Sequence, residues 1–307
     1  MASGGWVTWR AAWTQALYGP TGFYRRQRPA DHFRTSVHAS PLFAQVVVSL
    51  VRRLGVHHVT DYGAGGGELL AQIRALAPDL GLTGVELRQR PSDLPPEVNW
   101  VGQLPDQVWG LLIANELLDN VPCDVVELDN RQVVRVVEIQ PDTGVERLGA
   151  PIDPTGLEWL GRWWPVDRPG QRAEVGFARD RAWSGACARL GRGAALLIDY
   201  GHQRDSRPPA GTLASYRNGR QTPATPDGRH DLTAHVAVDS VAAAVGGQMK
   251  TQRQMLHELG VISRRPPVTT ARHQPAGYLR ALSTAGAVAE LTAQPGLGDF
   301  WWLLTPR

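Results

Sequence analysis

The sequence is poor in cysteine, lysine and aromatic residues. Lys250 is the only lysine among the 307 residues, and aromatic side chains make up 7% of the chain. Two cysteines, Cys123 and Cys187, cannot build the disulfide framework of a small secreted domain, and neither lies in a CxxC pair. We therefore expect two reduced, unreactive thiols.

Long apolar runs and targeting patterns are also missing. The longest apolar stretch, residues 42–51, is interrupted by Gln45 and Ser49, whereas a span of the bilayer takes roughly 20 apolar residues. The first residues show neither a signal peptide nor an arginine- and serine-rich transit peptide. These absences predict no membrane-spanning segment and favour a cytoplasmic protein, and they leave its oligomeric state open.

The sequence has no strongly basic stripe. The net charge is +3, and the arginines are scattered. The densest group comprises Arg25, Arg26, Arg28 and Arg34, and it fits a solvated loop better than an anion site. Nucleic-acid binders usually interleave basic and aromatic residues on one surface, so we expect no nucleic-acid partner.

What is present is an alternation of strands and helices, which is typical of a doubly wound, mostly parallel α/β sheet. The predicted strands are 56–61, 82–86, 98–101, 111–114 and 194–200, the predicted helices include 42–54 and 68–76, and 300–304 is a candidate final antiparallel strand. This pattern predicts one α/β core built from two separated stretches of sequence.

Segments between these stretches are expected to add further structure. Residues 125–128 and 133–139 flank a turn at 129–132 and predict a hairpin, and tryptophan-bearing helices are expected in 150–193. The expected organisation is N-terminal helices over 1–55, a first half of the core over 56–122, an inserted hairpin and helical cap over 123–193, and a second half over 194–307 with a long surface loop at 202–230.

The sharpest motif is the glycine-rich segment 61–68, which lies between a predicted strand and a predicted helix. Glycines let the backbone approach a ligand closely, and the helix start presents free N–H groups. A dinucleotide fingerprint would need glycine at position 68, which is Glu68. The acid-x-Gly-x-Gly-x-Gly pattern that is present instead suits S-adenosylmethionine, with candidate cofactor-binding residues Asp61, Gly63, Ala64, Gly65 and Gly67.

A second acid supports the same ligand. Glu86 closes the second predicted strand, where a carboxylate can accept hydrogen bonds from both hydroxyls of a ribose. Gln103 follows the third strand and is a candidate contact for the adenine edge, and Asn115, after the fourth strand, is a further candidate cofactor contact. The alternative is that the glycines form a tight turn and that Glu86 is a surface acid.

Polar residues also follow the fourth predicted strand. Asn115, Glu116 and Asp119 should face the crevice at the carboxyl ends of the strands, where they could hold a cationic substrate, although Asn115 and Asp119 could instead cap a short helix. Neither His57-His58 nor His235 has the spacing of a metal site, so no metal is expected. No Gly-x-Ser-x-Gly elbow and no P-loop occurs.

With these residues assembled, the chain resembles the MidA-like family of S-adenosylmethionine-dependent methyltransferases along almost its whole length. The resemblance is carried by the segments 16–24, 33–36, 40–43, 61–68, 113–122, 197–201, 211–216, 231–236 and 251–252. The Ala-Asn-Glu segment at 114–116 and the Asp-Leu-Thr-Ala-His-Val segment at 231–236 are the most specific. The resemblance implies a class I, Rossmann-like methyltransferase fold with a seven-stranded sheet and an inserted cap.

The resemblance also implies a protein substrate. Mitochondrial members of the family assist respiratory complex I assembly, and the implied reaction is methylation of an arginine of a partner protein such as a complex I subunit. Glu116 would orient and polarise the guanidinium, with Asp119 and Asn115 as further candidate catalytic residues. Tyr24 and His235 lie in the shared segments and are candidate substrate-binding residues.

One departure from the family pattern bears on the substrate. Where the family usually has a glutamate, this chain has His38, which is a third candidate substrate-binding residue. A non-catalytic assembly or chaperone factor that retains the cofactor pocket is therefore the alternative function. A nicotinamide-dependent oxidoreductase is disfavoured by Glu68.

Overall fold

The computed structural model describes residues 5–27, 36–217 and 219–307. The chain forms two compact units, each assembled from three separate segments. The insert unit comprises 1–33, 116–189 and 199–246, and the sheet unit comprises 34–115, 190–198 and 247–307. The expected segments 56–122 and 194–307 are therefore each divided between the two units.

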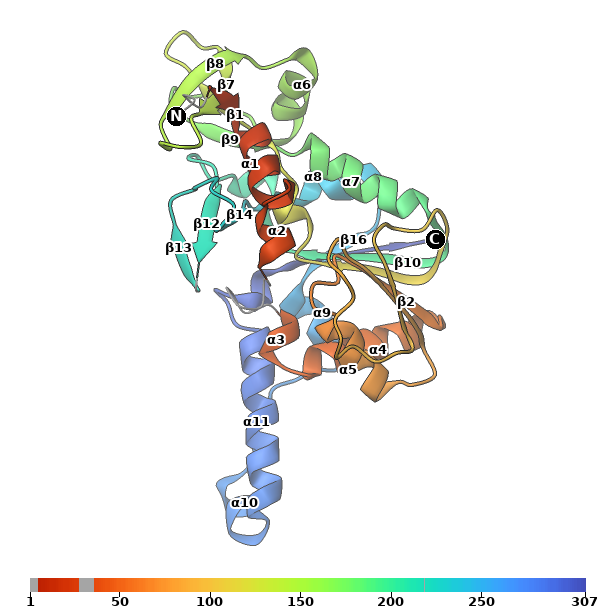
Figure 1. Ribbon diagram of the computed structural model, residues 1–307. Coiled ribbons are helices and arrows are strands. Elements are labelled where there is room, and N and C mark those ends of the chain that lie inside the picture. Colours follow the sequence, from red (N-terminus) through yellow and green to blue (C-terminus); the bar gives the residue numbers. More distant parts are fainter. Residues whose placement is uncertain (1–4, 28–35, 218) are drawn as a thin grey trace. The chain divides into compact units, whose positions relative to one another are not determined.

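The sheet unit is built on a seven-stranded sheet in the order β16-β17-β10-β5-β2-β3-β4 (Figure 1). Its strands are β2 (His58–Tyr62), β3 (Gly81–Val85), β4 (Val98–Val101), β5 (Val108–Asn115), β10 (Leu190–Asp199), β16 (Gln248–Thr251) and β17 (Trp301–Pro306). β10, β5, β2, β3 and β4 run parallel, whereas β16 and β17 pair antiparallel. The expected α/β class is confirmed, and the sheet is mixed because β17, whose C-terminal end pairs with the start of β10, runs opposite to its neighbours.

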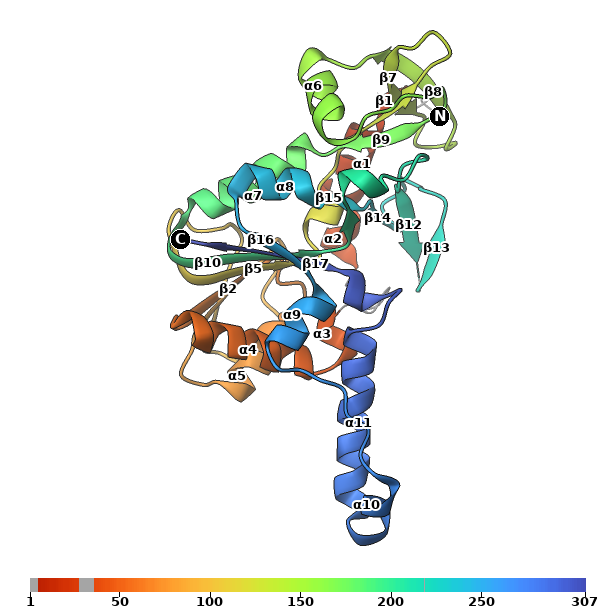
Figure 2. The same ribbon diagram turned by 180° about the vertical axis from the view of Figure 1, so that it is seen from behind.

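Helices of the sheet unit cover one face of this sheet or extend from it. They are α3 (Ser36–Ala39), α4 (Leu42–Leu54), α5 (Glu68–Leu76), α9 (Gln252–Glu258), α10 (Val268–His273), α11 (Pro275–Leu291) and the short η4 (Leu297–Asp299). In both views α4, α5 and α9 lie on the same side of the strands (Figure 2). Phe43, Leu70 and Ile73 from these helices share a buried cluster with Leu111 and Trp302 of the strands.

Local signals explain where two of these helices begin and end. Ser40 accepts a hydrogen bond from the N–H of Leu42 at 3.1 Å, and Gly55 ends α4 in the left-handed conformation with φ 65°. α5 begins at Glu68 directly after Gly67 and ends at Leu76, as predicted. The glycines at positions 63, 65, 66 and 67 therefore lie in the loop between β2 and α5.

The insert unit contains a five-stranded sheet in which β8 extends the order β1-β7-β6-β9. Its elements are β1 (Val7–Thr8), α1 (Trp9–Tyr18), α2 (Phe23–Arg26), η2 (Leu118–Asn120), β6 (Asp124–Leu128), β7 (Val134–Ile139), β8 (Glu146–Pro151), α6 (Pro154–Trp163), β9 (Arg172–Val175), α7 (Phe177–Ala188), β11 (Gly201–His202), η3 (Arg204–Ser206), β12 (Ala214–Arg217), β13 (Arg220–Thr222), β14 (Asp231–Thr233), β15 (Val236–Ala237) and α8 (Val238–Val245). The predicted hairpin is confirmed by antiparallel pairing of β6 with β7.

Tryptophans of α1 supply part of the core of the insert unit. Trp9, Trp13 and Leu17 are buried with Val137 of β7 and Leu232 of β14, so the apolar side of α1 faces the core. The indole N–H of Trp13 donates to the carbonyl of Leu232 at 3.1 Å. This bond ties the first helix to a strand more than two hundred residues later in the chain.

The expected surface loop at 202–230 is wrong in part. Within it, β12 pairs antiparallel with β13, and β12 also pairs with β14, which begins at Asp231. The polar, proline-rich composition hid these strands because they are short and contain few apolar residues. In the arginine-rich group, Arg25 and Arg26 lie in α2, whereas Arg28 and Arg34 lie outside the described residues.

Candidate functional site

The glycine loop lies at the carboxyl end of β2 in the sheet unit. The N–H groups of Gly63 and Ala64 both donate to the carbonyl of Val85 on the neighbouring β3, at 2.9 and 3.1 Å. Gly63, Gly65 and Gly67 have positive φ angles of 84°, 58° and 79°. At Gly67 a Cβ atom would come within 2.7 Å of Leu94, so this position requires glycine for both conformation and space.

Glu86 follows β3 and closes over the loop. One of its carboxylate oxygens accepts from the N–H of Gly65 at 3.0 Å, and the other accepts from the N–H of Arg88 at 3.2 Å. These bonds fix the carboxylate beside the glycines. Because each carboxylate oxygen can accept more than one hydrogen bond, both remain able to bind the hydroxyls of a ribose.

Three carboxyl groups converge on the loop. Asp61 at the end of β2 is 4% exposed, and burial, together with the charges of Glu86 and Glu68, raises its pKa to about 7. Such mutual repulsion means that the loop favours a ligand with positive charge. The sequence predicted Asp61 and Glu86 at this site, and the structure brings both to the loop.

His38 and Glu68 form a contact beside the loop. His38 Nε2 lies 3.7 Å from a carboxylate oxygen of Glu68, the first residue of α5. Burial raises the pKa of Glu68, but the hydrogen bond with His38 and backbone N–H groups outweigh it, so its pKa is lowered overall. The predicted substrate-binding residue His38 is therefore placed next to the glycine loop in the sheet unit.

Asn115 and Gln103 occupy different surroundings. Asn115 is the last residue of β5, which pairs with β2, and it is half-buried. Gln103 lies in an exposed bend after β4. The structure thus puts Asn115 at the sheet edge that carries the glycine loop and leaves Gln103 open to solvent.

Glu116 and Asp119 belong to the insert unit. Glu116 has φ 53°, a left-handed conformation that is uncommon for a residue with a side chain and that often marks functional sites. Asp119, in η2, is 4% exposed; one carboxylate oxygen accepts from the hydroxyl of Thr233 at 2.7 Å and from that of Tyr200. Its other oxygen, Oδ1, has no hydrogen-bond partner among the described residues.

Two further buried aspartates surround Asp119. Asp199 accepts from the backbone N–H groups of Leu118 and Asp119 at 2.9 and 3.3 Å. Asp231 accepts from the hydroxyl of Tyr24 at 3.0 Å. Burial, followed by the charge of Asp119, raises the pKa of both carboxyls well above the usual range. The three aspartates are called the acidic cluster below.

Arg179 provides positive charge near this cluster. It is 1% exposed, and its guanidinium donates to the backbone carbonyls of Asp119, Val121 and His235 at 2.8, 3.2 and 2.8 Å. The ring of His235 stacks edge-on against Tyr200 with centroids 5.2 Å apart. The predicted residues Tyr24, Asp119 and His235 are thus gathered around one network in the insert unit.

Sequence reasoning did not assign roles to Asp199, Tyr200, Asp231, Thr233 or Arg179. A signal was present for four of them, because Asp199-Tyr200 ends a buried strand and 231–233 lies in the most specific family segment. Arg179 gave no signal, since its partners are backbone atoms distant in sequence.

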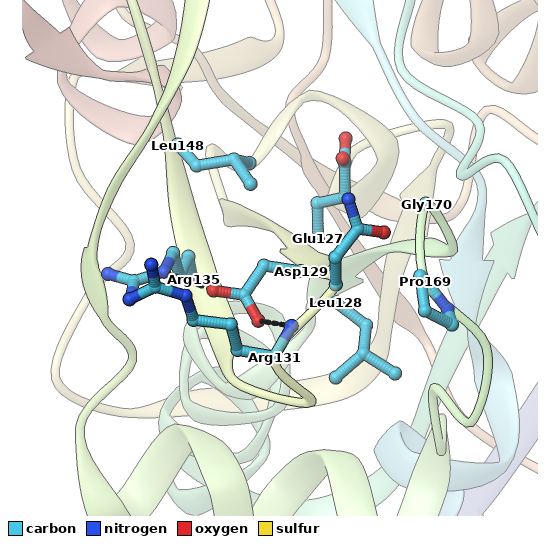
Figure 3. A pocket seen from close by; sticks show the side chains of 9 residues that line it. Glu127, Leu128, Asp129, Arg131, Arg135, Leu148, Pro169 and Gly170 are labelled. Carbon is cyan, nitrogen blue, oxygen red and sulfur yellow. Dashed lines mark hydrogen bonds and ion pairs between the residues drawn. The ribbon is translucent and has the colours of Figure 1, made fainter.

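A separate pocket of about 410 Å³ lies in the insert unit beside the β6–β7 turn (Figure 3). Asp129 at this pocket is paired with Arg135 at 2.6 Å and also accepts from the backbone N–H of Arg131 at 2.8 Å. No predicted site residue lines it. Over the described ranges, no group of His, Cys, Asp or Glu could hold a metal ion. In the same ranges, no helix is long and apolar enough to cross a membrane.

A comparison with protein families identifies the chain. The model of the family described as "Putative S-adenosyl-L-methionine-dependent methyltransferase" matches residues 72–255, which is more than half of the chain. The chain belongs to this family. MidA is a member, so the MidA-like resemblance is confirmed, and so is the expected cofactor, S-adenosylmethionine.

Solved structures agree with this assignment. The chain is similar to a COG1565 superfamily member from Burkholderia thailandensis bound to S-adenosyl-homocysteine, with TM-score 0.79 and 26% identity over 100% of this chain and 89% of that chain. It is also similar to a native crystal structure of a COG1565 superfamily protein from the same organism, with TM-score 0.77 and 27% identity over 100% and 88%. A comparison with curated proteins finds no match.

The described residues fit the methyl donor. Gly65 has open space where a Cβ would point, with no atom nearer than 3.8 Å, so a ligand can approach its backbone. Glu86 would supply a carboxylate for the ribose, and the surrounding acids suit the positive charge of a sulfonium. Asp61, Gly65 and Glu86 are therefore the residues that would hold it.

Proposed function

We propose that this methyltransferase methylates an arginine side chain of a partner protein. The observation that carries the proposal is the acidic cluster. Asp119, Asp199 and Asp231 are buried together with raised pKa values, and Asp119 retains an oxygen without a partner in the described chain. A cationic guanidinium bound near these carboxyls would relieve their repulsion and supply the missing hydrogen bond.

Glu116 is the residue proposed to touch the guanidinium. It directly follows Asn115, the last residue of β5, so the chain itself ties its carboxylate to the edge where the sheet binds ligands. Its left-handed backbone fixes the direction in which the side chain leaves the strand. The charge of Glu116 also contributes to the raised pKa of Asp199, so the two carboxyl groups sense each other.

In the proposed reaction the protein itself forms no covalent bond. S-adenosylmethionine supplies a methyl group already activated on a sulfonium, which accepts the C–S electron pair as the new N–C bond forms. Arginine stays protonated at neutral pH, so its nitrogen is a poor nucleophile until a carboxylate polarises it. Glu116 would align the guanidinium and accept the proton that leaves the nitrogen, and such alignment can contribute roughly 7–11 kcal/mol.

The proposal is tested by Glu116→Gln. The amide keeps the size of the side chain but cannot accept a proton, so transfer of labelled methyl groups to proteins of a gene-deleted host extract should fall at least about a hundredfold, the lower end of general-base contributions. Affinity for S-adenosylhomocysteine should stay within about twofold, because Glu116 is not a cofactor residue. Glu258→Gln, at an exposed site on α9, is the matched control. Equal activity of both variants would reject the role of Glu116.

A further inference from the structure

A helical hairpin extends from the sheet unit. α10 and α11 pack on each other, and α11 leads away from the strands with α10 beside its far end (Figures 1 and 2). Only the C-terminal part of α11 is anchored, through the buried side chains of Ala285, Val288 and Leu291 and a bond of 2.9 Å from Gln252 to the carbonyl of Leu291. Residues 262–282 are called the arm below.

The arm exposes large apolar side chains. Ile262 is 58% exposed, Val268 74%, Leu279 63% and Leu282 38%. Leu279 and Leu282 are three residues apart on α11 and therefore lie on the same helical face. Clustered exposed apolar residues of this kind mark an interaction site more often than scattered single ones.

The arm also carries charge of one sign. From Leu259 to Ala289 the sequence contains Arg264, Arg265, Arg272 and Arg280 but no aspartate or glutamate. Within the described chain, no ion pair or side-chain hydrogen bond is found for any of these four arginines. Their charges are therefore uncompensated and attract an anionic partner.

We propose that the arm is the docking surface for an acidic protein segment that presents its own apolar residues. Arginine beside large apolar and aromatic side chains is the typical composition of a protein interface, and half-buried Tyr278 adjoins Leu279. The leucine face of α11 also carries Ser283, four residues after Leu279, so it is not the broad apolar face of a membrane-surface helix. Two copies of the arm would repel each other, because both carry only positive charge.

A designed peptide tests the proposal. The probe is a fluorescent synthetic helix with leucine on one face and glutamate on the other, and binding to the full-length protein is followed by anisotropy. The double variant Leu279→Asp with Leu282→Asp should weaken binding at least about tenfold, as expected for central apolar anchors. Leu157→Asp is the matched control, since Leu157 is 46% exposed on α6 of the insert unit and should leave binding unchanged.

Further variants separate the contribution of charge to peptide binding from that of apolar contact. Arg264→Ser with Arg272→Ser should weaken binding and flatten its dependence on salt. Thermal melts should be unchanged in all variants, because the replaced side chains are exposed. Failure of the folded wild type to bind the peptide would overturn the proposal, as would equal binding of a glutamate peptide without leucine.

Two other outcomes would also overturn it. Binding to vesicles of phosphatidylcholine and phosphatidylglycerol that the leucine variant abolishes would identify a membrane as the occupant. A dimer in light scattering that the leucine variant converts to a monomer would identify a second copy of the chain.

Discussion

At the scale of single residues, the binding of a cationic cofactor is prepared by carboxyl groups that repel one another. Asp61, Glu68 and Glu86 gather at one loop, where His38 lies 3.7 Å from Glu68 and the guanidinium of Arg88 lies 3.5 Å from Glu86. A loop that is electrostatically unfavourable when empty gains more from a positively charged ligand than a neutral loop would. The sequence predicted Asp61 and Glu86, because acids at strand ends are local signals, but not the contact of His38 with Glu68, which depends on packing of α3 against α5.

Asp61 should make stability fall as pH rises. Its pKa is about 7 in the folded chain and about 3.9 when unfolded, so the folded state holds the extra proton between these values. The penalty is absent below about pH 4, grows as pH rises, and is fully present above about pH 7. We expect Asp61→Asn to make the fall shallower, since the acidic cluster with its raised pKa values contributes a fall of its own, and to raise the unfolding midpoint at pH 8.

Thermal melts from pH 4 to pH 8, without cofactor, measure the effect. The exposed Asp93→Asn is the control and should follow the wild-type curve. If the curve of Asp61→Asn also ran parallel to that of the wild type, Asp61 would not be the group that titrates.

At the scale of elements, local sequence motifs determine the bounds of some helices, whereas pairing between distant residues determines the short strands. The bounds of α5 and the stop of α4 at Gly55 were predictable, because glycine and the start of a helical stripe are local features. β12, β13 and β14 were not, since each is three or four residues long and forms only through pairing with the others. The acidic cluster was not predictable either, because its three aspartates come from three separate elements, η2, β10 and β14.

The bond from Thr233 to Asp119 should therefore stabilise the insert unit by joining β14 to η2. Thr233→Val keeps the shape of the side chain but removes a donor to a buried carboxylate, and a loss of about 1–3 kcal/mol in the free energy of unfolding is expected. Urea unfolding measures it. Thr225→Val removes an exposed hydroxyl bond to Pro223 and should change stability by less than about 0.5 kcal/mol. Equal stability of the two variants would show that the network is not structural.

At the scale of the whole molecule, the candidate cofactor residues lie in one unit, and most candidate substrate residues lie in the other. The candidate cofactor residues Asp61, Gly65 and Glu86 belong to the sheet unit, together with the substrate candidate His38, and the candidates Tyr24, Glu116 and Asp119 belong to the insert unit. The chain passes from one to the other directly after Asn115, at the end of β5. The sequence predicted these candidate residues through motifs, whereas the interleaving of three segments in each unit could not be read from composition.

The most direct test of the account is calorimetric titration with S-adenosylhomocysteine. We expect the wild type to bind and Glu86→Gln to bind about tenfold to a hundredfold more weakly, because charge-assisted hydrogen bonds to the ribose and to the loop N–H contribute about 1.5–3 kcal/mol. Glu97→Gln, at a half-exposed site just before β4, should retain wild-type affinity. Equal affinity of all three proteins, or no binding by the folded wild type, would contradict the assignment of the glycine loop and Glu86 as the cofactor site.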